Sequence, residues 1–257
     1  MRSLDAAMTI SKASGIELKV EWYKDPNLMS EYFENLFEVP SQIKKIITKN
    51  YMGKFGKLQK TIQKRLNKIK YKHCLYEKDL AAFINDGGDL VELAKSGSLC
   101  IASCKGFYPV SPMFENFKPK PEILNEVNSV IGGHENIIGV HIRRDDHLEA
   151  IRRSPLDLFE KIMSEEIKLT PDIKFFLATD SLETQEHMIN LFSDKIIMHQ
   201  KTSLDRDNVS AIKDAMIDLY CLSRARKIIG SYGSSFSDVA AQINDIELII
   251  LDNEKDG

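Results

Sequence analysis

Three groups of polar residues each follow a short apolar run in the second half of the chain. The first is H-I-R-R-D-D-H, from His141 to His147, which holds two arginines, two acids and two histidines. The second contains Asp180, and the third is the serine-rich stretch from Ser231 to Ser237. Ligands of open parallel sheets bind beyond the carboxyl ends of the strands. Polar residues in these positions are therefore candidates for a binding site.

The arginines of the first group are suited to an anion, because a guanidinium can donate two parallel hydrogen bonds to one phosphate. If the strand continues through the group, side chains alternate, and His141 and Arg143 point to one face. Arg144 then points to the other face, where it can pair with Asp145 or Asp146. Both arginines are candidate donor-binding residues, and Arg143 is the stronger candidate for phosphate binding. Taken alone, the group could also be a surface salt-bridge network.

The serine-rich stretch leads into a predicted helix over residues 235–243. The first N–H groups of a helix and its dipole favour an anion, and serine hydroxyls add donors. Ser234 and Ser235 are therefore candidate donor-binding residues. Serines ahead of a helix are, however, more often simple N-caps.

The second half alternates between strands and helices. Apolar runs predict strands at residues 137–142, 174–178, 195–199, 227–231 and 248–251. Helical spacing predicts helices at residues 155–169, 182–192, 209–225 and 235–243. This alternation favours a parallel sheet with helices on both faces.

The first half is less regular. Predicted helices lie at residues 2–13, which Gly15 would end, and at residues 27–37 and 76–94. Strands are predicted at residues 16–22 and 99–103. Because an α/β domain normally opens with a strand, the N-terminal domain is expected to lack its first strand. We predict two domains, residues 1–125 and 126–257.

Residues 43–72 form the strongest charge run, with eleven cations and no acid. The cations are Lys44, Lys45, Lys49, Lys54, Lys57, Lys60, Lys64, Arg65, Lys68, Lys70 and Lys72. We interpret the run as a basic helical insertion, most simply a solvated face. Because apolar residues interleave with the lysines, peripheral contact with anionic lipid is a second interpretation. Nucleic acid is disfavoured, since no recognised binding motif is present.

Composition narrows the function classes. The net charge is -3, so the molecule as a whole has no electrostatic basis for binding nucleic acid. The cysteines have no zinc spacing, and we expect no metal site. There is no apolar run of membrane-spanning length and no signal peptide. We expect a cytoplasmic protein, with any contact to the inner face of the membrane being peripheral.

In order and spacing, three segments resemble the motifs of the fucosyltransferase superfamily. They are G-V-H-I-R-R-D-D-H, F-L-A-T-D-S and I-D-L-Y-C-L-S-R-A-R-K-I-I-G-S-Y-G-S-S-F-S-D-V-A. The superfamily includes the bacterial nodulation fucosyltransferase and the α-1,6- and protein O-fucosyltransferases. The resemblance covers residues 137–243, with a weaker match over residues 1–24. It implies a GT-B fold, in which two Rossmann-like domains face each other and the N-terminal one lies on the acceptor side.

The resemblance also implies roles for single residues in binding a GDP-sugar donor. Arg143 matches the arginine that contacts the β-phosphate, and Ser234 matches a phosphate-binding serine. His141 and Asp218 match residues that recognise guanine. Asp180 matches an acid near the nucleotide. From its residues alone, Asp218 would be on the exposed polar face of a helix.

The implied reaction is an inverting displacement without a metal or other cofactor, with GDP-fucose as donor and a glycan or lipid-linked saccharide as acceptor. Arg143 would stabilise the leaving diphosphate. Glu149 and His147 are the candidates for accepting the hydroxyl proton. Asp146 matches a structural acid. Because a glycine-rich loop normally precedes the position where this sequence starts, a non-catalytic nucleotide-sugar-binding protein is the alternative.

Overall fold

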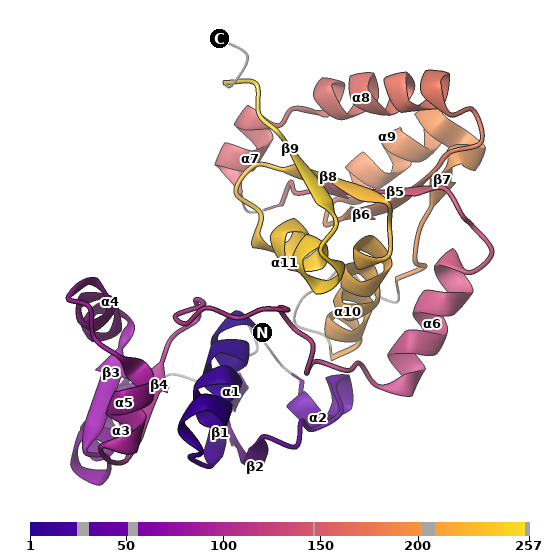
Figure 1. Ribbon diagram of the computed structural model, residues 1–257. Helices are drawn as coiled ribbons and strands as arrows, with labels where there is room; N and C mark the ends of the chain where they lie inside the picture. The colour runs from indigo at the N-terminus through magenta and orange to yellow at the C-terminus, as the bar shows by residue number, and fades with distance from the viewer. Residues whose placement is uncertain (25–30, 51–55, 146, 202–208, 255–257) are drawn as a thin grey trace. The chain divides into compact units, whose positions relative to one another are not determined.

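The computed structural model describes residues 1–24, 31–50, 56–145, 147–201 and 209–254 (Figure 1). The chain divides into two compact units, Met1–Lys118 and Pro119–Gly257. Helix α6 spans Pro121–Ile131, so the boundary predicted between residues 125 and 126 falls inside this helix. Pro121 lies at the first turn of α6, where proline needs no hydrogen-bond partner for its nitrogen.

Unit 1 begins with helix α1, Arg2–Ser14. Gly15 ends it in the left-handed conformation, with a φ of 72°, and donates its N–H to the carbonyl of Ser11. This confirms the glycine C-cap predicted from the sequence. Strand β1, Leu18–Lys24, follows, and the chain then forms the short helix α2, Phe33–Leu36.

The rest of unit 1 holds two small parallel sheets. Strand β2, Ile43–Asn50, pairs with β1, and β3, His73–Tyr76, pairs with β4, Leu99–Ala102. Helices α3, Gly56–Lys70, α4, Glu77–Asn85, and α5, Leu90–Lys95, complete the unit. The single helix predicted at 76–94 is therefore two helices. Gly87 has a φ of 78° in the turn between them, and the side chain of Asp89 caps α5.

The predicted basic helical insertion at residues 43–72 is wrong in its first part. Residues 43–50 form the parallel strand β2, and only residues 56–70 form a helix, while 51–55 lie outside the described residues. The reason is local composition. Ile43, Ile46, Ile47 and Thr48 are β-branched, and such side chains fit a pleated strand better than a helix.

Unit 2 is built on a five-stranded parallel sheet with the order β7-β6-β5-β8-β9. Its strands are β5, Ile137–Ile142, β6, Lys174–Thr179, β7, Ile196–Ile197, β8, Lys227–Ser231, and β9, Glu247–Leu251. Its later helices are α7, Leu148–Arg153, α8, Leu156–Leu169, α9, Leu182–Phe192, α10, Val209–Ser223, and α11, Ser235–Asn244. Every strand and helix predicted here is present, and α7 is an addition.

The sheet of unit 2 is covered on both faces, as the alternation predicted. Helices α8 and α9 lie on one face and α10 and α11 on the other (Figure 1). Phe159 of α8 and Met188 of α9 join the fully buried side chains of β5 in one apolar cluster. On the other face, a Cβ on Gly139 would lie 2.9 Å from Leu222 Cδ2 of α10. The glycine therefore lets α10 approach the central strand closely.

None of the helices within the described ranges combines the length and apolar composition needed to cross a bilayer.

Candidate functional site

The carboxyl ends of the three central strands of unit 2 lie side by side. In the sheet register, His141 of β5 is opposite Ala178 of β6 and Gly230 of β8. The residues that follow each strand therefore meet at one edge of the sheet, where parallel sheets bind ligands. The described residues of all three polar groups found in the sequence lie at this edge.

Arg143 is held at this edge by contacts to both neighbouring strands. Its Nη1 lies 2.9 Å from Oδ2 of Asp180, which follows β6, and the two side chains are 23% and 17% exposed. Its backbone N–H donates to Oγ of Ser231, at the end of β8, over 3.0 Å. Asp180 also accepts the N–H of Arg144 at Oδ1, at 2.8 Å. Asp180 therefore positions the arginine-containing loop.

Arg144 supports the same loop through its side chain. Its Nη1 donates to the carbonyl of Arg143 at 2.9 Å and its Nη2 to the carbonyl of Ser154 at 2.8 Å. The guanidinium lies 5.8 Å from the centre of the Phe159 ring. Burial lowers the pKa of Arg144. These contacts, which sequence spacing did not indicate, tie the end of β5 to the end of α7. Asp146 lies outside the described residues.

We expect Arg144→Met to lower the free energy of unfolding by about 2 kcal/mol, because two partly buried carbonyls lose a charged donor. Arg152→Met is the matched control, since Arg152 is 54% exposed and forms surface ion pairs, and it should change stability far less than Arg144→Met. Chemical denaturation of both variants measures the difference. Equal stabilities would contradict the supporting role of Arg144.

His141 is buried at the centre of the edge, with 6% of its surface exposed. Its ring packs against Phe236 of α11 with 5.0 Å between ring centres, and Ser234 Oγ lies 3.4 Å from its Nδ1. Burial lowers the pKa of His141 to about 4. The ring is therefore neutral near pH 7, so one of its nitrogens is a hydrogen-bond donor and the other an acceptor.

The pKa of His141 gives a testable pH dependence of stability. Between the ordinary value of 6.5 and the folded value of about 4, the unfolded chain binds the proton more readily than the folded one. Stability should therefore fall as the pH decreases through this window, by up to about 3 kcal/mol. His141→Gln should remove this part of the pH dependence, whereas the exposed control His187→Gln should keep it. Denaturation curves across the window measure both.

The amino end of α11 supplies backbone donors at the same edge. Ser234 is its N-cap and makes no side-chain cap bond, while Ser237 Oγ donates to the carbonyl of Ser234 at 3.1 Å. The first N–H groups of a helix have no acceptor within the helix. Gly233 precedes them with a φ of 68°, and a Cβ on this glycine would lie 3.4 Å from Cε1 of His147. The His147 ring therefore lies against the serine-rich loop.

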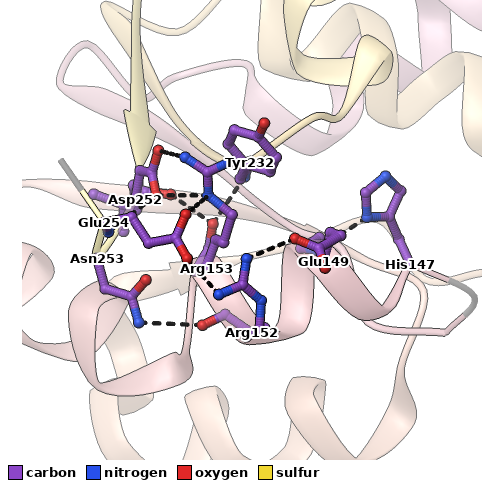
Figure 2. Close-up of polar contacts among 11 residues, drawn as sticks. His147, Glu149, Arg152, Arg153, Tyr232, Asp252, Asn253 and Glu254 are labelled. Carbon is purple, nitrogen blue, oxygen red and sulfur yellow. Dashed lines mark hydrogen bonds and ion pairs between the residues drawn. The ribbon is translucent and has the colours of Figure 1, made fainter.

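The two candidate proton acceptors are both engaged (Figure 2). His147 caps α7, and its Nδ1 accepts the N–H of Ala150 at 2.9 Å, so the neutral ring carries its proton on Nε2. Glu149 is exposed and pairs with Arg152 over 2.8 Å. The hydrogen bond from Arg152 lowers the pKa of Glu149. In this arrangement His147 is a hydrogen-bond donor at Nε2, and Glu149 is a weak base.

Helix α7 is fastened to the end of β9 (Figure 2). Arg153 Nε donates to Asp252 Oδ1 at 2.9 Å, and its guanidinium lies 3.5 Å from the centre of the Tyr232 ring. Ser154 Oγ donates to the carbonyl of Leu251 at 2.5 Å and accepts the N–H of Tyr232 at 2.8 Å. The loop after β8 and the end of α7 are thereby held together.

A second charged group lies where β6 and β7 end. Asp218 of α10 is buried, with 4% of its surface exposed, so the expectation of an exposed polar face is wrong. Lys201 Nζ lies 2.8 Å from Asp218 Oδ2 and donates to the carbonyl of Thr179 at 2.7 Å. Nearby, His199 Nε2 lies 3.1 Å from Asp214 Oδ1.

The two carboxylate oxygens of Asp218 differ in their contacts. Within the described part of the chain, no group donates a hydrogen bond to its buried Oδ1. Burial raises the pKa of Asp218, and the charge of Lys201 opposes this effect. A buried carboxylate oxygen without a donor is costly, so it is a natural acceptor for a ligand. Lys201 was not among the residues that the motifs indicated, although its position just beyond a predicted strand was a usable signal.

No protein-family model and no curated protein matches the sequence. Solved structures do match. NodZ α-1,6-fucosyltransferase soaked with GDP-fucose aligns at 17% identity over 93% of this chain and 86% of that chain, with a TM-score of 0.61. NodZ from Bradyrhizobium aligns at 18% over 92% and 86%, with a TM-score of 0.58. POFUT1 in complex with GDP aligns at 13% over 97% and 94%, with a TM-score of 0.57. The chain therefore has the α/β GT-B fold of these proteins, as the resemblance of its motifs implied.

Proposed function

We propose that the chain is a glycosyltransferase that uses a GDP-sugar, with GDP-fucose as the donor. The observation that carries the proposal is the combination at one sheet edge of Arg143, the amino end of α11 and the buried Asp218 carboxylate. Arg143 and the amino end of α11 suit a diphosphate, and the Asp218 carboxylate suits a nucleobase that carries hydrogen-bond donors. The fold shared with NodZ soaked with GDP-fucose and with POFUT1 in complex with GDP supports this choice.

Guanine fits the Asp218 carboxylate because of its donor pattern. Its N1–H and exocyclic N2–H₂ are adjacent donors, which one carboxylate can accept together. Uracil offers a single N–H on the corresponding edge, and adenine places an acceptor beside its amino group. Neutral His141 adds a donor or acceptor and a ring surface. We therefore assign base recognition to Asp218 and His141.

The diphosphate is assigned to Arg143 and to the amino end of α11, with Ser234 and Ser235 there. In the proposed displacement, an acceptor hydroxyl oxygen bonds to the anomeric carbon while the bond from that carbon to the β-phosphate oxygen breaks, with inversion. Arg143 and the helix N–H groups stabilise the charge on departing GDP, so we propose that no metal is required. The acceptor is proposed to be a hydroxyl of a glycan or a lipid-linked saccharide.

Proton transfer from the hydroxyl is assigned to Glu149 or His147, the two residues that the sequence indicates. For Glu149 to act, it must leave its ion pair with Arg152. For His147 to act, it must release the N–H of Ala150. Because both are engaged, a nucleotide-sugar-binding protein without turnover is the second candidate function.

Lys201 should set the pH range of nucleotide binding. The charged Asp218 is the form that accepts both guanine donors, so affinity should fall as the pH drops through the pKa of this carboxyl group. Besides Lys201, His199 and Asp214 act on this pKa. Lys201→Met removes a charge that lowers the pKa, so the midpoint of the affinity profile should move to higher pH, while Lys201→Arg should restore it. Calorimetry with GDP across pH measures this, and an unchanged midpoint would contradict it.

The direct test of the proposed function is turnover. The purified chain is incubated with GDP-fucose and a panel of glycans and lipid-linked saccharides, and GDP release and product mass are measured. Fucosylated product from wild type, reduced by a factor of about 100 or more in Arg143→Ala, would support the transferase. Guanine-selective binding with no product and no hydrolysis would favour the non-catalytic alternative.

A further inference from the structure

Helix α3 has its polar and apolar sides reversed relative to an ordinary surface helix. Its inward side is polar, because Asn67 is buried and contacts Gln63, with Oδ1 accepting from Nε2 at 2.7 Å. Asn67 Nδ2 in turn lies 3.7 Å from Cys100 Sγ of β4. Helices normally turn their apolar stripe toward the core instead. The apolar stripe of α3 must therefore lie elsewhere.

That stripe lies on the exposed side. Its residues recur at spacings of four, four and three, which places them along one face of a helix. The members, with their exposed fractions, are Leu58 57%, Ile62 48%, Leu66 52% and Ile69 84%. Four large aliphatic side chains in one row, all about half exposed or more, form an apolar surface with no cover among the described residues.

Cations accompany the stripe on the same helix. Lys60, Lys64, Arg65, Lys68 and Lys70 are all exposed, and the helix has no acidic residue. Exposed cations therefore flank the exposed aliphatic side chains along the same helix. A partner must combine negative charge with an apolar layer.

We propose that α3 docks unit 1 onto an anionic lipid bilayer. The aliphatic stripe would enter the boundary between headgroups and acyl chains, and the cations would pair with lipid phosphates at the headgroup level. A bilayer supplies both parts, a charged surface directly above an apolar layer. Nucleic acid supplies the charge and no apolar layer. This proposal is independent of the sugar-transfer proposal.

Co-sedimentation with lipid vesicles tests the docking. Wild type should bind vesicles of phosphatidylcholine mixed with phosphatidylglycerol at least about 10-fold more strongly than phosphatidylcholine alone, and salt should weaken this binding. The test variant is the triple substitution Ile62→Ser, Leu66→Ser and Ile69→Ser, which alters only exposed side chains. It should lose at least about 10-fold in binding, because the apolar contribution is removed. Thermal unfolding checks that it remains folded.

The matched control is Leu169→Ser, Leu182→Ser and Leu191→Ser, three exposed leucines of unit 2. This control should bind vesicles as wild type does. Lys64→Gln with Lys68→Gln should reduce binding to the anionic vesicles only. Wild type that fails to bind anionic vesicles, or a triple α3 variant that binds as well as wild type, would overturn the proposal. A dimer that the α3 variant dissociates, without vesicle binding, would instead assign the stripe to a second copy of the chain.

Discussion

Arg143→Ala should reduce the affinity for GDP and GDP-fucose by a factor of roughly 100. In the structure, the guanidinium is held at the edge of the sheet by Asp180, while its backbone is fixed by Ser231. A preorganised cation loses little side-chain entropy when a phosphate binds. Its removal should therefore cost most of the binding free energy of a charge-assisted bidentate contact. Isothermal titration calorimetry with both nucleotides measures the loss.

Two further variants distinguish the charge of Arg143 from its forked geometry and from the general loss of an arginine. Arg143→Lys keeps the charge and loses the forked geometry, so it should bind with intermediate affinity. Arg152→Ala removes an exposed arginine that pairs with Glu149 and Glu254, and it should bind as wild type does. If Arg143→Ala stays folded and binds GDP with unchanged affinity, the phosphate assignment is wrong.

Asp218→Asn should cause the second large loss, again by a factor of roughly 100 for GDP. The amide keeps the size of the carboxylate but turns one acceptor into a donor, which faces the donors of guanine or the ammonium of Lys201. Because Asp218 is buried against Lys201 at 2.8 Å, neither water nor movement relieves this mismatch easily.

Comparison of GDP with IDP, which lacks the exocyclic amino group, makes this prediction specific to the base. Wild type should prefer GDP by about 10-fold, since one hydrogen bond is lost in IDP. Asp218→Asn should lose this preference, and the exposed control Asp194→Asn should keep it. A variant that still prefers GDP would show that the amino group of guanine is recognised by another residue.

The second unit was predictable from sequence because its strands are short, apolar and evenly separated by helical segments. Strands buried on both faces give continuous apolar runs, as in Ile137–Ile142, where every residue is buried. Polar residues directly after such runs were thus recognisable as residues of the sheet's carboxyl edge. Arg143, Asp180 and the serine-rich loop do lie at this edge. The GT-B fold was implied by the resemblance of these motifs to those of the fucosyltransferase superfamily, and the comparisons confirm it.

The details of the site depended on contacts that sequence spacing does not encode. Alternation along β5 could not show that Arg144 would bind the carbonyl of Ser154 at the end of α7. The ion pair between Lys201 and Asp218 joins the segment after β7 to helix α10. The two residues meet only through the tertiary fold, which no local pattern encodes. Helical periodicity alone predicted that Asp218 is exposed, whereas α10 is buried on more than one side.

The first unit was harder to predict for two reasons. Its sheets have two strands each, and the charge run at residues 43–72 contains a strand, β2, that the pattern did not indicate. Lysines in β2 alternate with β-branched residues irregularly, and a run of like charges is usually a solvated helix or loop. The parallel pairing with β1 outweighed that preference. In α3, the apolar stripe was visible in the sequence, whereas its outward direction was a tertiary property.

The measurement that tests the central claim most directly is calorimetric titration of the wild-type chain with GDP, GDP-fucose, UDP and NAD under one set of conditions. We expect GDP and GDP-fucose to bind, and UDP and NAD to bind at least about 100-fold more weakly, because only guanine presents two adjacent donors to Asp218. A folded chain that binds none of the four, or that prefers UDP or NAD, would contradict the assignment of this sheet edge to a guanine nucleotide-sugar.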